Sequence, residues 1–119
     1  MITEIDHFQL TGPVGCEPAA REFYGELLGL PEIPKPPLLE VSGGIWFELG
    51  NGQQLHIGIE PDFTPARKAH PGLTTTDLDA LAAVLGNAGV EVIWDERIPG
   101  VRRFKAHDPF GNQIEFRTG

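Results

Sequence analysis

The chain has 119 residues, of which 40% are hydrophobic and 22% charged, the proportions of an ordinary globular protein. A formal net charge of −8 makes nucleic acid an unexpected partner, because the phosphate backbone would be repelled. No apolar run approaches the roughly 20 residues that cross a bilayer, so no membrane segment is expected. The single Cys16 cannot form an internal disulfide, which fits a cytoplasmic protein.

The first half of the chain predicts a strand, a helix and three further strands. Alternation of polar and apolar side chains predicts a strand over 5–11, with His7 on its polar face. An apolar stripe at helical spacing predicts a helix that begins near Pro18 and ends at Gly29. After a proline-rich connection, short apolar runs between glycine turns predict strands over 38–41, 45–49 and 53–59.

The second half repeats this plan. His70 begins the same His-x-x-Leu pattern that begins at His7. A second apolar stripe predicts a helix from Leu78 to a stop near Gly89. Three more strands are predicted over 90–94, 101–106 and 112–117.

This duplication predicts an α+β fold built from two βαβββ modules. Residues 1–119 are expected to form a single domain, with module one at 1–60, a linker at 61–68 and module two at 69–119. The modules are expected to form a cupped mixed β-sheet with the helices on its outer face. The polar strand faces are then expected to line a cleft.

Four side chains that can bind a metal stand at equivalent positions of the repeat. His7 and His70 lie on the first predicted strand of each module, and His56 and Glu115 lie on the last. Three imidazoles and one carboxylate suit a divalent transition metal such as Zn, Ni, Co, Mn or Fe, whereas calcium takes only oxygen ligands. Four such ligands leave about two open positions on an octahedral ion, while a closed tetrahedral zinc site would be structural.

Three further residues are predicted to bind substrate. Trp46 and Glu48 share the polar face of a middle strand and are expected to shape a pocket. Arg103 alternates with apolar neighbours and is expected to pair with an anionic substrate. Plain packing of Trp46 and solvation of Arg103 are the alternatives. His107 has no partner in the repeat and is interpreted as a structural or surface residue.

The chain resembles the vicinal oxygen chelate superfamily, which groups glyoxalases, bleomycin-resistance proteins and extradiol dioxygenases. The resemblance covers nearly the whole chain and is carried by five strings: Asp6-His7-x-x-Leu10, Phe23-Tyr24-x-x-Leu27-Leu28-Gly29-Leu30, His70-x-x-Leu73, Gly89-Val90-Glu91-Val92 and Asp108-Pro109-Phe110-Gly111-Asn112-x-x-Glu115. It implies paired βαβββ modules and a metal held at the positions of His7, His56, His70 and Glu115. It also implies a homodimer, because many such proteins complete the site between two chains.

This resemblance implies a metalloenzyme that acts on a small substrate with two neighbouring oxygens. Proton-transfer chemistry of a lyase or isomerase is favoured, with the metal as a Lewis acid and Glu115 as the catalytic base. An iron-dependent dioxygenase and a bleomycin-resistance-like binding protein without catalysis are the alternatives. The histidine at position 56 differs from glyoxalase I-type members, which usually have Glu or Gln there.

Overall fold

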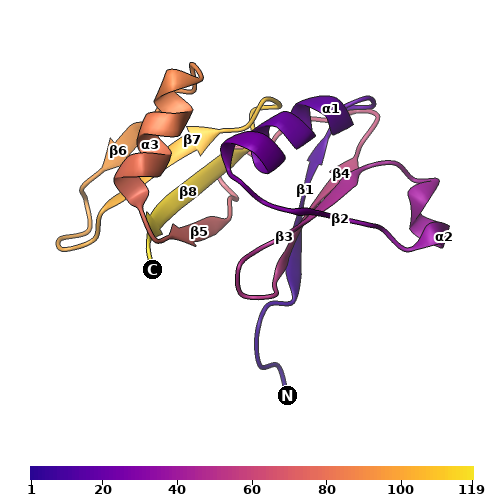
Figure 1. Cartoon of the computed structure of the whole chain (residues 1–119), viewed down its shortest axis with the longest axis horizontal. Coiled ribbons are helices and arrows are strands. Elements are labelled where there is room, and N and C mark those ends of the chain that lie inside the picture. The colour runs from indigo at the N-terminus through magenta and orange to yellow at the C-terminus, as the bar shows by residue number, and fades with distance from the viewer. The chain divides into compact units, whose positions relative to one another are not determined.

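The computed structural model describes residues 1–119, which divide into two compact units, Met1–Thr64 and Pro65–Gly119. Each unit contains a mixed four-stranded sheet and a helix of its own (Figure 1). The predicted α+β fold in two modules is confirmed. None of the helices combines the length and the hydropathy that crossing a bilayer requires.

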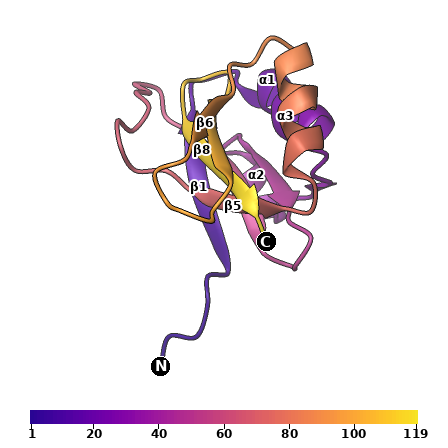
Figure 2. The same cartoon turned by 90° about the vertical axis from the view of Figure 1, so that its left-hand side faces the viewer.

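The sheet of the first unit has the strand order β1-β4-β3-β2. Strand β1 (His7–Gly12) runs parallel to β4 (Gln54–Ile59), which pairs in the antiparallel sense with β3 (Ile45–Glu48). The first six residues extend from β1 and adopt no regular structure (Figure 2). Alternate apolar residues of β3 and β4 form the buried face of the sheet: Ile45, Phe47, Leu55 and Ile57.

A helix covers this buried face. Helix α1 (Glu17–Ala20) continues directly into a π-helical segment, η1 (Arg21–Leu27). The predicted helix is therefore confirmed, although most of it has the wider π-helical turn. Tyr24 is fully buried in η1, and its ring lies 5.8 Å from that of Phe47 on β3. Gly29, at φ +73°, follows the helix and supplies the left-handed residue that ends it.

The strand predicted over 38–41 is wrong. This segment is instead a short helix, α2 (Pro37–Glu40), and the edge of the sheet is formed by β2 (Glu32–Ile33). Pro37 suits the first turn of a helix, because its missing N–H is not needed there. Leu38 is 89% exposed, so its apolar character does not reflect a place in the sheet.

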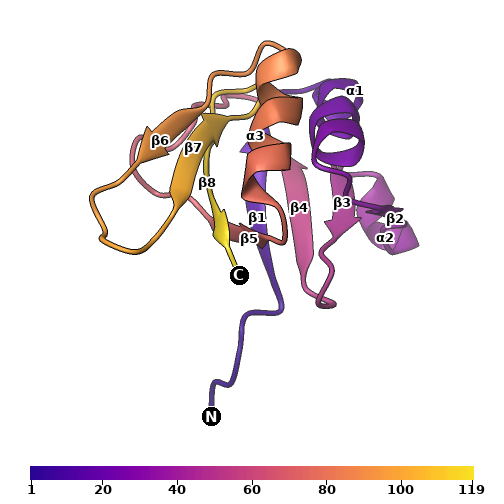
Figure 3. The ribbon, with the colours of Figure 1, turned by 60° about the vertical axis from the view of Figure 1, so that its left-hand side comes forward.

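The sheet of the second unit has the order β5-β8-β7-β6 (Figure 3). Strand β5 (Gly72–Thr75) is parallel to β8 (Gln113–Thr118), and β7 (Arg103–His107) lies antiparallel between β8 and β6 (Ile93–Asp95). Strand β6 therefore begins three residues later than predicted. Four side chains of β7 and β8 are fully or almost fully buried: Phe104, Ala106, Ile114 and Phe116.

Helix α3 (Leu78–Asn87) packs against β8 and confirms the second predicted helix. Its apolar stripe buries Leu78 and Leu85. The capping residue is Asp77, whose side chain accepts a hydrogen bond from the backbone N–H of Ala80 at 3.0 Å.

The register of the parallel strands relates the two units. In the first unit, His7 stands two positions before Gln9, the residue that pairs with His56. In the second unit, His70 stands two positions before the residue that pairs with Glu115. The two histidines are therefore equivalent in the repeat, although His70 precedes β5 and does not lie within it.

Gly44 offers a test of the close approach between β3 and β4. It has φ +91°, and a Cβ there would lie 2.4 Å from the backbone oxygen of Ile57. We expect Gly44→Ala to lower the free energy of unfolding by about 1–3 kcal/mol, measured by urea denaturation followed by circular dichroism. Gly86→Ala is the matched control, because the space around Gly86 in α3 is open and its φ is helical; it should raise stability by roughly 0.5–1 kcal/mol. Wild-type stability of Gly44→Ala would contradict the proposed steric conflict.

Candidate functional site

Three aromatic rings lie side by side across the first sheet. His56 on β4 stands directly opposite Trp46 on β3, and the two rings are parallel within 1° with their centroids 3.8 Å apart. The ring of His7 on β1 is stacked with that of His56 at 4.5 Å and 21°. Because β4 lies between β1 and β3, the imidazole of His56 is held between the other two rings.

His56 is buried, with 5% of its surface exposed, and its one recorded hydrogen bond joins Nε2 to Gln54 Oε1 at 2.9 Å. Gln54 stands two positions earlier on β4 and therefore projects from the same face of the strand. Burial, and then the nearby imidazole of His7, lower the pKa of His56. The neutral imidazole that results is the form that binds metals.

His7 lies at the beginning of β1 and is about half exposed. Its Nδ1 lies 2.8 Å from the carboxylate oxygen Oδ2 of Asp6. A carboxylate accepts hydrogen bonds, so it places the imidazole proton on Nδ1 and leaves the lone pair on Nε2. Metal-binding histidines commonly have such an outer partner on the nitrogen that does not bind the metal.

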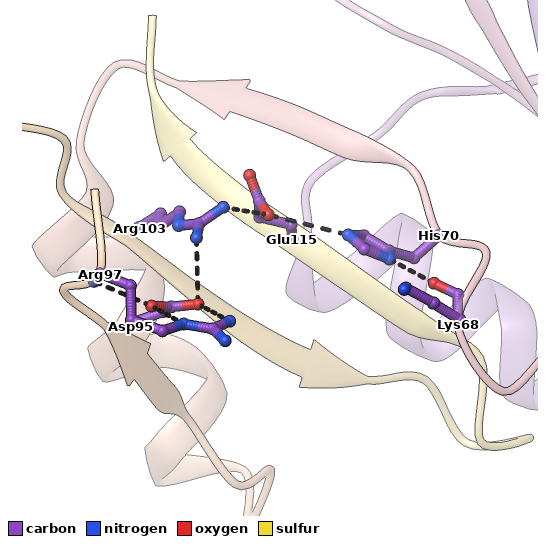
Figure 4. Close-up of polar contacts among 6 residues, drawn as sticks. All are labelled: Lys68, His70, Asp95, Arg97, Arg103 and Glu115. Carbon is purple, nitrogen blue, oxygen red and sulfur yellow. Dashed lines mark hydrogen bonds and ion pairs between the residues drawn. The ribbon is translucent and has the colours of Figure 1, made fainter.

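The second unit brings His70 and Glu115 together (Figure 4). His70 Nε2 lies 3.7 Å from Glu115 Oε1, while its Nδ1 lies 2.7 Å from the backbone oxygen of Lys68. The carbonyl accepts a hydrogen bond from Nδ1, so Nε2 is the nitrogen that faces the carboxylate. Only 29% of the His70 side chain and 13% of the Glu115 side chain are exposed.

A chain of alternating charges continues from Glu115 (Figure 4). Arg103 donates from Nη1 to Glu115 Oε1 at 3.0 Å and from Nη2 to Asp95 Oδ2 at 3.1 Å. Arg97 donates to the same Asp95 from Nη2, at 2.6 Å, and from Nε, at 2.9 Å. The two cations offset the two carboxylates. Glu115 is therefore held in place from β7, its neighbouring strand.

Both terminal nitrogens of Arg103 are occupied by carboxylates, and its Nε is buried without a hydrogen-bond partner. To bind an anionic substrate with its fork, as predicted, Arg103 would have to exchange one of these carboxylates. Glu48, also predicted to bind substrate, is exposed at the end of β3. Trp46 is only partly exposed, and one face of its ring lies against His56.

The structure thus brings together two of the predicted ligand pairs, His7 with His56 and His70 with Glu115. It contains no group of three or more His, Cys, Asp or Glu side chains that could hold a metal ion. The four-ligand set therefore stays a prediction. Sequence analysis missed Gln54 and Asp95 as partners of the predicted residues; alternation along β4 was the one available signal, because it puts Gln54 on the face of His56.

The His70 and Glu115 pair fits a metal. Two donor atoms that are each about 2.0–2.2 Å from one ion lie roughly 3.0–3.6 Å apart, close to the 3.7 Å observed between Nε2 and Oε1. His7 also offers a free Nε2. His56 fits in part, because its neutral ring keeps one nitrogen available while the other is bonded to Gln54. The donor set of imidazole and carboxylate suits a divalent transition metal.

Comparison with known families defines the class of protein. The model of the Glyoxalase/Bleomycin resistance protein/Dioxygenase superfamily matches residues 4–116. The chain belongs to this superfamily, in agreement with the resemblance seen in the sequence. Comparison with curated proteins gives no match.

Solved structures share this fold over the whole chain. A provisionally assigned glyoxalase family protein from Bacillus anthracis is 49% identical, with a TM-score of 0.95 over 100% of this chain and 97% of its own. TnmS3, an antibiotic binding protein from Streptomyces sp. CB03234, is 27% identical, with a TM-score of 0.74 over 98% of this chain and 96% of its own. Lactoylglutathione lyase from Agrobacterium tumefaciens is 20% identical, with a TM-score of 0.76 over 99% of this chain and 95% of its own, and shows the fold alone.

Asp95 should make stability depend on pH. The side-chain and backbone hydrogen bonds from Arg97, with the charge of Arg103 as a smaller cause, hold the pKa of Asp95 well below its ordinary value. The carboxyl group of Asp95 therefore takes up a proton at a higher pH in the unfolded chain than in the folded one. The stability that the Asp95 carboxylate contributes is complete above about pH 4 and is lost as the pH falls further. We expect the thermal midpoint of Asp95→Asn to fall less steeply than that of wild type below pH 4.

The control for this pH profile is Asp62→Asn, which removes the same charge from an exposed segment of the first unit. The thermal midpoint of Asp62→Asn should depend on pH in the same way as that of wild type. Parallel curves for wild type and Asp95→Asn over the acid range would contradict the assigned role of Asp95.

Proposed function

We propose that this protein is a divalent-metal-dependent enzyme of its superfamily. Its substrate is a small molecule that chelates the metal through two neighbouring oxygens, and the favoured reaction is the proton transfer of a lyase or isomerase. The proposed ligands are His7, His56, His70 and Glu115. The membership in the superfamily and the similarity to the glyoxalase family protein of Bacillus anthracis support the class of enzyme.

One observation carries the proposal: His70 Nε2 faces the carboxylate of Glu115, with 3.7 Å between this nitrogen and Oε1. Both side chains are mostly buried, and the outer nitrogen of the histidine is already satisfied by Lys68. An imidazole lone pair and a carboxylate oxygen repel each other at such a distance unless a proton or a cation lies between them. A divalent cation satisfies both groups and agrees with their separation.

The first unit supplies two imidazoles to the proposed set. His7 is prepared by Asp6, and His56 by its burial and its bond to Gln54. With one carboxylate as the only charged ligand, the metal keeps a net positive charge. When bound, the metal supplies Lewis acidity, which favours an oxygen-chelating substrate and the loss of a proton next to a carbonyl.

Glu115 is the proposed catalytic base. Its Oε1 accepts a hydrogen bond from Arg103 Nη1 at 3.0 Å, so that oxygen is already occupied. Arg103 therefore fixes the position of the carboxylate, and a proton reaches Glu115 most readily through its second oxygen. Trp46 and Glu48 remain proposed to border the substrate, with Trp46 forming part of a cavity of about 210 Å³ in the first unit.

A small-molecule binding protein without catalysis is the second candidate. The 27% identity to TnmS3, an antibiotic binding protein, favours it. The cavity beside Trp46, of about 210 Å³, is smaller than the 300–1,000 Å³ of sites that enclose drug-sized ligands, whereas a cavity beside Trp94 in the second unit, of about 360 Å³, lies within that range. This candidate needs no metal, so metal content separates the two.

Elemental analysis of the purified protein, before and after loading with Zn, Ni, Co, Mn or Fe, tests the proposal. We expect about one transition-metal ion per set of four ligands. His70→Ala and Glu115→Gln should each lose most of this metal, because each removes one donor of the facing pair. The matched control is His107→Ala, which removes an exposed imidazole outside the proposed set and should keep the wild-type metal content.

A wild-type protein that takes up no transition metal would support the binding protein. Equal metal loss in His107→Ala and His70→Ala would point to non-specific uptake. Light scattering on the metal-loaded protein then gives the oligomeric state, and a monomer would exclude a set of ligands shared between two chains.

The reaction is tested by a screen of metal-loaded protein against α-keto hemithioacetals, acyl-thioester epimers and catechols. We expect solvent deuterium to enter one of the first two classes at the carbon next to the carbonyl. Glu115→Gln should abolish this exchange, whereas His107→Ala should preserve it. Oxygen-dependent ring cleavage of a catechol would instead assign the protein to the dioxygenases.

A further inference from the structure

The second sheet carries a lysine that does not pair with the carboxylate opposite it. Lys105 on β7 stands directly opposite Glu115 on β8, and such paired residues project from the same face. Arg103 nevertheless takes the Glu115 carboxylate, from two positions earlier on β7, and it also bonds to Asp95 (Figure 4). Lys105 forms no hydrogen bond and no ion pair, and it is only partly exposed. The ammonium group of Lys105 is therefore available to a ligand.

Lys105 lines a cavity of about 360 Å³ beside β6, the outer strand of this sheet. The lining consists of Ile93, Trp94, Asp95, Glu96, Arg97 and Lys105. Ile93 pairs with Lys105, so the two side chains share a face, and Ile93 is 36% exposed. Trp94 is 43% exposed, although tryptophan is usually well buried. The cavity thus combines apolar surface with one unpaired ammonium group.

The other charges of the lining are paired or exposed. Asp95 is buried and accepts hydrogen bonds from both Arg97 and Arg103, so its charge is offset. Arg97 is engaged with the same carboxylate through two of its nitrogens. Glu96 forms no hydrogen bond, but it is exposed to water, where salt screens its charge. Lys105 is less exposed and acts on a ligand more strongly, so the cavity favours an anionic group.

We propose that this cavity binds a small organic anion, with the carboxylate of the ligand on Lys105 Nζ and its apolar body against Ile93 and Trp94. The volume of about 360 Å³ lies within the range of small-molecule sites. None of the lining residues is a proposed metal ligand, so the inference goes beyond the proposed function and requires no metal. It also assigns the anion to Lys105 and not to Arg103, whose terminal nitrogens are both occupied.

A titration of the metal-free protein with 3-phenylpropanoate tests this inference. Proton–nitrogen correlation spectra of ¹⁵N-labelled, chelator-treated protein give both the position of the ligand and its dissociation constant. We expect the backbone signals of Ile93 and Lys105 and the indole N–H signal of Trp94 to shift. The chain has two tryptophans, so the indole signal of Trp94 is assigned by its absence from Trp94→Phe. Shifts confined to the surroundings of Trp46, or no shifts at all, would overturn the inference.

Charge variants test the role of Lys105. Lys105→Gln should weaken the binding of 3-phenylpropanoate about 10-fold, because a hydrogen bond between two charged groups is lost. The neutral 3-phenylpropanamide should bind wild type about 10-fold more weakly than the acid does, and Lys105→Gln should change its affinity little. Arg117→Gln is the control, because it removes another unpaired cation from the same face of the sheet but outside the cavity. It should bind the acid as wild type does.

The remaining outcomes separate a specific site from general attraction. Equal weakening by Lys105→Gln and Arg117→Gln would overturn the site, and equal affinity for the acid and the amide would overturn the anionic ligand. Tighter binding of phenylalanine than of 3-phenylpropanoate would instead assign the cavity to a zwitterion held by Lys105 and Glu96. Thermal midpoints show whether each variant is folded, and Lys105→Arg, which keeps the charge, should bind the acid more tightly than Lys105→Gln. Because the titration uses metal-free protein, its result is independent of the metal analysis.

Discussion

The candidate site depends on the parallel pairing of the first and last strands of each unit. In both units the histidine stands two positions before the residue that pairs with the second proposed ligand, and this register is the same for β1 with β4 and for β5 with β8. A slip of one residue would turn every side chain of the strand to the other face. The apolar alternation that buries Leu55 and Ile114 therefore also decides which side His56 and Glu115 occupy.

The same backbone plan carries two different chemical environments. In the first unit, His56 of the proposed ligand pair lies between aromatic rings and beside a neutral amide, and burial lowers its pKa. In the second unit the pair ends a row of alternating charges that passes through Arg103 to Asp95. The first unit thus holds its proposed ligands by ring stacking and exclusion of water, and the second unit holds its own by directional ionic hydrogen bonds.

Much of this was accessible from sequence, and the exceptions have physical causes. Strands β4 and β8 were predicted because their alternation is regular, and with them the equivalence of His56 and Glu115. The strand predicted at Leu38 was wrong, because a short apolar run beside prolines is compatible with either a strand or a helical turn. The stack of Trp46 on His56 and the bond of Arg103 to Glu115 join neighbouring strands, so they depend on a register that local pattern does not contain.

The separate support of the two ligand pairs has a consequence for protein engineering. The residues that orient His56 are uncharged and lie on β3 and β4, while those that hold Glu115 are ionic and lie on β6 and β7. Libraries confined to the first group would vary the surroundings of His56 without altering local charge. Libraries confined to the second would vary the ionic hydrogen bonds that hold Glu115. A laboratory selection can therefore change the support of one side chain without disturbing that of the other.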